Sequence, residues 1–352
     1  MIKKKAFFKY AISPANELEN CNFVKSILMI LVVFYHSALF WGGNWFKGTP
    51  VFDSAVLGTI AEWLNTFHIF GFALVSGYIF YFLKIEKAKY QEFVPFIENK
   101  AKRLLVPYVF VCLVWAIPFR VIFFKDDMDI INKFVLGTGP NQLWFLLMLF
   151  WVFVAFWCFA GFFDKHTILG SIVVCACYGI SIVAPMIFPN ILQIWQGFRY
   201  LAFFWIGFKF RQYPEIFLKK IPASIWLLTH IGLFTVMKFV SQYDSTIMKL
   251  LNLALTFGVC VVGSIMSFIL LQKIAEKVTN KGSRLLKLLN ENSMSVYLFH
   301  QQLIYVFIYL LNGVVNPYLN TGINFFGSMA ISLLIAFVLK KFKITRFLIG
   351  EK

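Results

Sequence analysis

Charged residues are scarce in this chain. Lys, Arg, Asp and Glu make up 14% of its 352 residues, against about a quarter in soluble globular domains, and this excludes an ordinary soluble protein. Hydrophobic residues make up 60% and aromatic residues 19%. The apolar residues fall in runs of about 20, the length of helix that crosses a bilayer. The composition therefore predicts an all-α, polytopic membrane protein.

Signatures of several other classes are missing. The six cysteines form no CxxC pair and mostly lie inside apolar runs, so we expect neither a disulfide framework nor a metal site. The sequence has no Gly-x-Ser-x-Gly elbow, no Gly-x-x-x-x-Gly-Lys loop and no His-Glu-x-x-His motif, which argues against lipase-like, P-loop and zincin chemistry. No cleavable signal, internal repeat or second domain is evident. We therefore expect a single transmembrane domain over residues 1–352.

Basic residues indicate the orientation of the predicted spans. Of the 33 Lys and Arg residues, 25 fall in segments on the side of the N-terminus and four on the opposite side. The positive-inside rule therefore places both ends, residues 1–22 and 344–352, in the cytoplasm. The cations are spread over many short loops, so membrane lipids and not nucleic acid are the expected partner of the net charge of +17. About ten spans are expected, near 23–41, 57–83, 104–124, 142–163, 167–188, 195–211, 221–241, 248–272, 290–311 and 322–343.

The first apolar run carries a cation at one end and an imidazole near the other. Lys25 and His36 are separated by eleven positions, which returns a helix to within roughly 20° of the same face and advances it by about 16 Å. Each such group costs a few kcal/mol in hydrocarbon. Two more histidines, His68 and His300, fall inside the second and ninth runs. One buried histidine is ordinarily a helix-to-helix hydrogen bond, but three predict a shared cavity.

The motifs around these residues resemble those of acyltransferase family 3, the bacterial membrane O-acyltransferases of polysaccharides and related glycans. The family has a basic residue, usually Arg, then ten intervening residues and a histidine, with Gly after the base and an acid three positions before it. This chain has Lys25, Ser26 and Asn22 there. The other similar motifs are His68 followed by Ser76-Gly77-Tyr78, Lys102-Arg103 before the third span, Leu143-Trp144-Phe145-Leu146, and Ser295-x-Tyr297-x-x-His300.

This resemblance implies an O-acyltransferase that moves an acyl group, with acetyl-CoA as donor, to a hydroxyl of a cell-surface glycan or a lipid-linked sugar in the bacterial inner membrane. A base near neutral pKa suits that chemistry, so His36 is expected as the general base, with His300 or His68 orienting it or donating. Donor phosphates are assigned to Lys25, Lys102 and Arg103, and substrate contacts to Trp144, Tyr297 and Arg199.

Other interpretations remain open for several of these residues. Positive-inside charge explains Lys102 and Arg103, an interfacial anchor explains Trp144, and Ser76 is expected to be a packing residue and not a nucleophile. The depth of Glu62, Arg120 and Arg199 is left open, as are the acceptor and the oligomeric state. A glycan or acyl-group transporter is the alternative function, since buried polar residues within ten spans fit transport as well.

Overall fold

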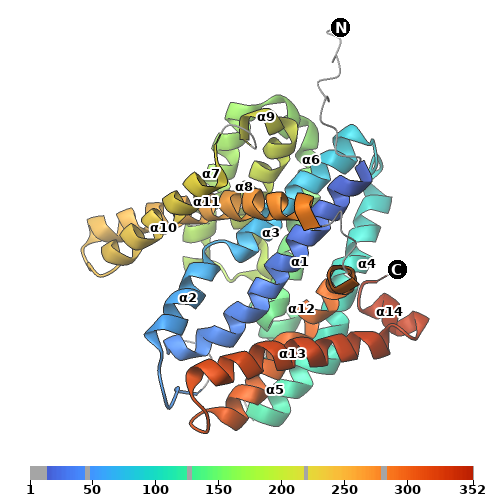
Figure 1. Ribbon diagram of the computed structural model, residues 1–352. Helices are drawn as coiled ribbons and strands as arrows, with labels where there is room; N and C mark the ends of the chain where they lie inside the picture. The colour runs from blue at the N-terminus through green and yellow to red at the C-terminus, as the bar shows by residue number, and fades with distance from the viewer. Residues whose placement is uncertain (1–13, 44–47, 125–128, 218–220, 279–283, 352) are drawn as a thin grey trace.

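Helices make up the regular structure of the described chain (Figure 1). This computed structural model describes residues 14–43, 48–124, 129–217, 221–278 and 284–351. The predicted basic tail 1–22 lies partly outside them, and its second part forms the start of the first helix. The α-helices are α1 (Pro14–Leu39), α2 (Ala55–Asn65), α3 (His68–Tyr81), α4 (Phe93–Val111), α5 (Ile117–Phe124), α6 (Trp144–Lys165), α7 (Thr167–Val183), α8 (Ile194–Gln212), α9 (Pro214–Phe217), α10 (Ala223–Val240), α11 (Thr246–Val278), α12 (Arg284–Leu311), α13 (Pro317–Leu339) and α14 (Lys343–Leu348).

Short 3-10 and π-helical turns join or extend these helices. They are η1 (Phe40–Gly42), η2 (Phe82–Glu86), η3 (Cys112–Ala116), η4 (Ile131–Val135), η5 (Asn141–Leu143), η6 (Ala184–Met186) and η7 (Ile191–Gln193).

The predicted membrane bundle is confirmed. Nine helices of the described residues are long and apolar enough to cross a membrane. The sixth predicted span, 195–211, forms α8 at the expected place, but α8 is not among these nine, because its charged and amide residues make it less apolar. All six cysteines are free thiols in the structure.

The second predicted span lies within the apolar stretch Ala55–Glu86, which is long enough to cross a membrane and is built from two helices. α2 ends at Asn65 and α3 begins at His68, with Thr66 between them. The Thr66 hydroxyl donates to the carbonyl oxygen of Trp63 at 2.6 Å, which closes the end of α2. Residues 84–103, which the predicted second and third spans leave as a connection, are also partly helical, because α4 already begins at Phe93. The first turns of α4 carry many charges, so a search for apolar runs does not detect where this helix begins.

Close contact between α3 and α8 fixes the middle of the bundle. A Cβ at Gly77 would lie 1.9 Å from the carbonyl oxygen of Phe204, and one at Gly207 would lie 1.8 Å from that of Leu74. Only glycine permits backbones to approach this closely. Ser76 donates to the carbonyl oxygen of Phe72 at 2.9 Å, as a packing serine does.

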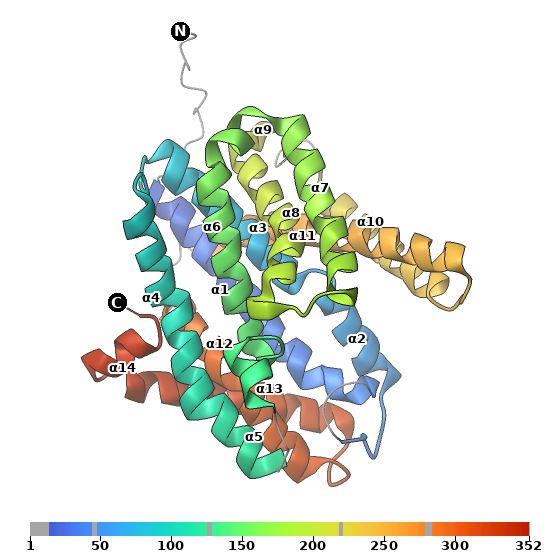
Figure 2. The same cartoon turned by 180° about the vertical axis from the view of Figure 1, so that it is seen from behind.

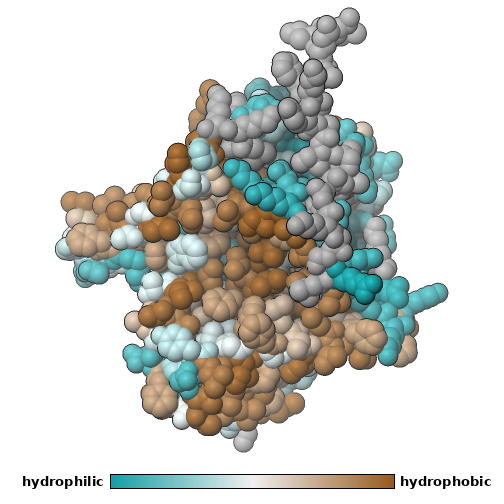
Figure 3. Space-filling model, in the orientation of Figure 1, coloured by the Kyte–Doolittle hydropathy of each residue, from teal (hydrophilic) through white to brown (hydrophobic). Residues whose placement is uncertain are grey.

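The remaining helices surround this pair. α1 contacts α3, α11, α12 and α13, so it lies between the two halves of the chain. The hairpin of α10 and α11 projects from the body in both views (Figures 1 and 2). Hydrophobic side chains cover much of the face drawn in Figure 3, including this hairpin, while hydrophilic ones gather near α14. An apolar outer surface of this kind suits a bilayer.

Candidate active site

A pair of histidine rings joins α1 to α12. The Nδ1 atom of His36 lies 2.9 Å from the Nε2 atom of His300, although 264 positions separate them in the chain. His300 is fully buried, whereas His36 is only half-buried. The structure thus brings these two residues together as expected, and a substrate can reach His36 more readily than His300.

Hydrogen bonds assign the protons of this pair. The Nδ1 atom of His300 lies 3.0 Å and 2.8 Å from the carbonyl oxygens of Val296 and Tyr297. Carbonyl oxygens only accept, so in the neutral ring Nδ1 carries the hydrogen and Nε2 the lone pair. That lone pair accepts from Nδ1–H of His36. The Nε2 atom of His36 therefore carries the lone pair that a general base needs.

His68 lies beside the pair but does not bond to it. Its Nδ1 atom donates to the carbonyl oxygen of Leu64 at 2.5 Å. Its ring packs against Tyr35, with 4.8 Å between centroids, and Tyr35 in turn lies 5.0 Å from His36. With Nδ1 protonated, Nε2 of neutral His68 is an acceptor, so the predicted donating role of His68 would require the charged ring.

Gln142 ties α12 to the start of α6. Its side-chain amide donates to the carbonyl oxygen of Leu298 and to Oε1 of Gln302, each at 2.9 Å. Its backbone N–H donates to Oε1 of Gln301 at 2.9 Å, and the Tyr297 hydroxyl donates to its carbonyl oxygen. These four partners bracket His300 in sequence. The sequence did not predict this role of Gln142, because a single amide before an apolar run matches no motif.

Replacing Gln142 with leucine is expected to lower the free energy of unfolding by about 1–3 kcal/mol. The change leaves the buried Leu298 carbonyl and the Gln302 amide without their partner. Because α12 carries His300, a reaction that uses the histidine pair should also slow. Thermal unfolding and steady-state rates of the purified protein measure both effects. Gln272→Leu is the control, since its amide makes one weak contact, 3.5 Å from Cys21 Sγ.

Two predicted substrate residues have definite surroundings. The Tyr297 hydroxyl donates to the carbonyl oxygen of Gln142, and its ring centroid lies 6.0 Å from that of Phe145 and 6.2 Å from that of His300. Tyr297 therefore positions α12. Trp144 is half-buried, and its ring centroid lies 5.7 Å from that of Tyr200.

Residues of α1 and α4 form a cluster of cations. Lys25 is near enough to Arg103 for their charges to interact, and Lys100 is near enough to Lys25, Lys89 and Arg103. The Nζ atom of Lys100 lies 3.6 Å from the centroid of the Phe153 ring, a cation–π contact. These cations repel one another, so an anion bound among them would be stabilised. The sequence had pointed to Lys25 and Arg103 but not to Lys100.

Lys102, predicted with Arg103, is placed differently. It forms an ion pair with Glu98 one helical turn earlier, and both side chains are more than half exposed. Glu62 and Arg120, whose depth was open, have partners as well. Glu62 pairs with Lys238, and Arg120 donates to Oδ1 of Asn141 at 3.3 Å.

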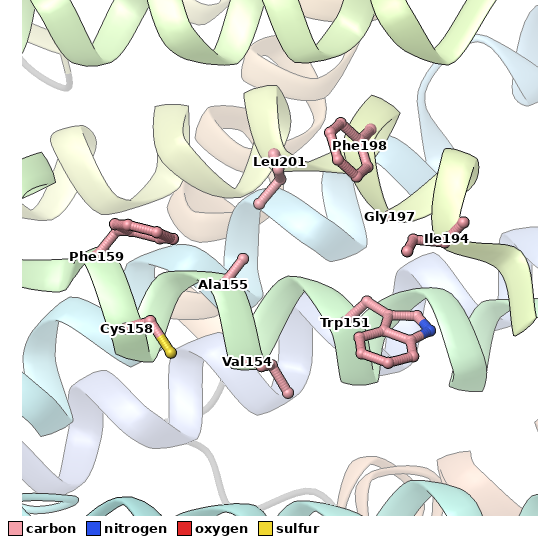
Figure 4. Close-up of a pocket in the computed structure, with 9 residues that line it drawn as sticks. All are labelled: Trp151, Val154, Ala155, Cys158, Phe159, Ile194, Gly197, Phe198 and Leu201. Carbon is pink, nitrogen blue, oxygen red and sulfur yellow. The ribbon is translucent and has the colours of Figure 1, made fainter. Parts of the chain in front are cut away.

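Neither a metal centre nor the clearest surface pocket adds to this site. Within the described residues, no three His, Cys, Asp or Glu side chains could hold a metal ion together. A groove of about 180 Å³ lies between α6 and α8 (Figure 4). Its lining is apolar and contains none of the candidate residues: Trp151, Val154, Ala155, Cys158, Phe159, Ile194, Gly197, Phe198 and Leu201.

Comparison of the sequence with known families identifies the family of this chain. The sequence model described as "Acyltransferase domain" matches residues 18–341, nearly the whole chain. The chain belongs to acyltransferase family 3. This family 3 protein is a multi-pass membrane acyltransferase, and the match contains all nine predicted site residues. Searches of curated proteins and of solved structures found no significant match.

Proposed function

We propose that the protein is an O-acyltransferase that moves an acetyl group from cytosolic acetyl-CoA to a hydroxyl of a cell-surface glycan or lipid-linked sugar. The pairing of His36 with His300 carries the proposal, because it supplies an oriented base on the helix that also bears Lys25 of the cationic cluster. The positive-inside distribution supports an inner-membrane location with both termini in the cytoplasm.

In the proposed reaction, Nε2 of His36 takes the proton of the acceptor hydroxyl. The hydroxyl oxygen attacks the thioester carbonyl, a C–O bond forms, and the C–S bond breaks. The CoA thiolate leaves and takes the proton back from His36, so no proton is gained or lost overall. The His300 acceptor holds the His36 ring while charge develops on it.

The cationic cluster is proposed to hold the phosphates of the donor. Lys25 and Arg103 face this group of charges from two helices, and Arg103 offers a guanidinium fork that matches phosphate. The flexible thiol arm of CoA would then cover the roughly 16 Å along α1 that separates Lys25 from His36.

Purified full-length protein in liposomes, incubated with radiolabelled acetyl-CoA and a crude glycan extract, tests the function. Label that appears in the glycan fraction, with a gain of one acetyl mass by mass spectrometry, supports the enzyme. Movement of glycan across the vesicle membrane with no covalent label would instead identify a transporter.

Replacing Lys100 with glutamine is expected to raise the KM for acetyl-CoA about tenfold, because one charge-assisted bond to phosphate is worth roughly 1.5–3 kcal/mol. The effect should vanish with S-acetylpantetheine, a donor without the nucleotide phosphates. Initial rates against donor concentration measure both. Lys102→Gln is the matched control and should change KM less than twofold, since its ion pair with Glu98 is solvent-exposed. Equal effects of both variants would remove Lys100 from the donor site.

A further inference from the structure

Arg199 stands apart from the other arginines of the bundle. It lies in the second turn of α8 and is half-buried. Its Nε atom is buried without a partner, and across the described residues its side chain makes no hydrogen bond and no ion pair. By contrast, Arg211 at the far end of the same helix binds two carboxylates. A partly buried charge without a counter-charge is costly, and such groups mark functional positions within membrane proteins.

The neighbours of Arg199 do not neutralise it. Its charge acts on Tyr200, on Tyr178 of α7 and on Cys260 of α11. A phenol and a thiol are neutral under ordinary conditions. The guanidinium therefore keeps its positive charge and its donors for a group from outside the described chain.

Aromatic rings connect Arg199 to the histidine pair. The ring of Tyr200 stacks on Phe70, with 4.9 Å between centroids and 9° between planes, and lies 5.7 Å from Trp144. Tyr200 also lies near Tyr35. Tyr35 in turn packs against His36 at 5.0 Å. This row of aromatic rings thus has the Arg199 cation at one end and the His36 base at the other.

The start of α8 is held firmly. Leu192 and Gln193 adopt left-handed backbone conformations, with φ of 49° and 60°. Leu192 N–H donates to the carbonyl oxygen of Leu136 at 2.7 Å, and the Gln193 amide donates to that of Gly137 at 2.6 Å. A side chain shortly after so constrained a turn is placed by the fold and does not depend on a mobile loop.

We propose that Arg199 binds an anionic oxygen group, phosphate or carboxylate, on the acyl acceptor. A guanidinium fork matches either group bidentately. The sugar of the acceptor then lies against the half-buried Trp144, whose ring provides an apolar face, with its hydroxyl directed toward His36. This inference rests on the proposed transferase function and narrows its acceptor to one that carries negative charge.

Binding to purified full-length protein in nanodiscs tests the inference with two matched pairs of probes. Undecaprenyl phosphate is compared with undecaprenol, and trigalacturonate with maltotriose, all without acetyl-CoA. Wild type is expected to bind the charged member of one pair at least tenfold more tightly than its neutral partner. The pair that shows the preference tells whether the charge belongs to a lipid phosphate or a sugar carboxylate.

The variants then assign that preference. Arg199→Gln should abolish it, and Arg199→Lys, which keeps the charge but loses the fork, should retain part of it. Lys238→Gln removes a cation that is paired with Glu62 and should leave the preference intact. Acetyl-CoA binding and the melting temperature report whether each variant is folded. If Arg199→Gln does not fold, Arg199→Lys is used for the test.

Two results would overturn the inference: no discrimination by wild type within either pair, or an unchanged preference in the folded Arg199 variant that is used. Failure of the transferase function is a separate outcome. Anionic probes would then still bind through Arg199, but no label from acetyl-CoA would reach any glycan.

Discussion

Replacing His36 with glutamine should lower acyl transfer by about 10²- to 10⁴-fold, the range that a positioned general base contributes. Glutamine keeps a similar size and an amide that can donate to His300, so the helix contact is retained. It has no basic nitrogen, so the acceptor hydroxyl keeps its proton. Because the cationic cluster lies near Lys25, about three turns away along α1, acetyl-CoA should bind as tightly as before.

Two measurements separate chemistry from binding in this variant. Single-turnover transfer of radiolabelled acetyl gives the rate, and equilibrium binding of acetyl-CoA gives the affinity. His166→Gln is the matched control, since His166 lies between α6 and α7 and contacts Phe162 at 5.5 Å, away from the pair. Transfer within threefold of wild type in the His36 variant would exclude His36 as the base.

His300 should behave as a positioning residue. His300→Leu removes the acceptor of the His36 Nδ1–H bond but leaves the base in place, so we expect a smaller loss, about 10- to 100-fold. The double variant with His36→Gln should be little worse than His36→Gln alone, because residues that act as a unit are not additive. Independent, multiplying losses would show that the two rings do not work together.

The sequence predicted those features that depend on composition and helical spacing. Apolar runs of about 20 residues located the membrane helices, and the eleven-residue step placed Lys25 and His36 on one face of α1. A short distance between His36 and His300 was also expected, since both lie deep in apolar runs. A single sequence does not show which residues of different helices contact each other. Gln142 and Lys100 became candidates only because the structure places Gln142 beside α12 and Lys100 near Lys25 of α1.

Breaks in helices were harder to predict for a related reason. Thr66 interrupts a continuous apolar run by donating to the carbonyl oxygen of Trp63, and His230 of α10 lies 3.0 Å from the same hydroxyl. That contact joins residues 164 positions apart, so local helix propensity cannot predict it. Tyr78 belongs to a motif that resembles the family only by its residues, and the sequence predicts no partner for it. In the structure it donates to Glu17 at 2.5 Å in a separate ionic cluster.

That cluster joins the ends of three elements and gives the largest expected effect on stability. Arg211 of α8 donates to both carboxylate oxygens of Glu86, at 2.8 and 2.7 Å, and also binds Glu17 near the start of α1. The side chains of Arg211 and Glu17 are only 7% and 13% exposed. The chain has Asn22 where the family has an acid before the first motif, and Glu17 forms the ion pair of this region instead.

Arg211→Met is expected to lower the free energy of unfolding by about 3–5 kcal/mol, because it leaves two carboxylates facing each other with no cation between them. The melting temperature should fall by on the order of 10 °C. Adding Glu17→Gln and Glu86→Gln removes the stranded charges and should restore most of that loss, which a simple packing defect would not allow. Arg284→Met, at an exposed arginine, should change little. If the triple variant melts no higher than Arg211→Met, the cluster stabilises the protein through packing and not through charge.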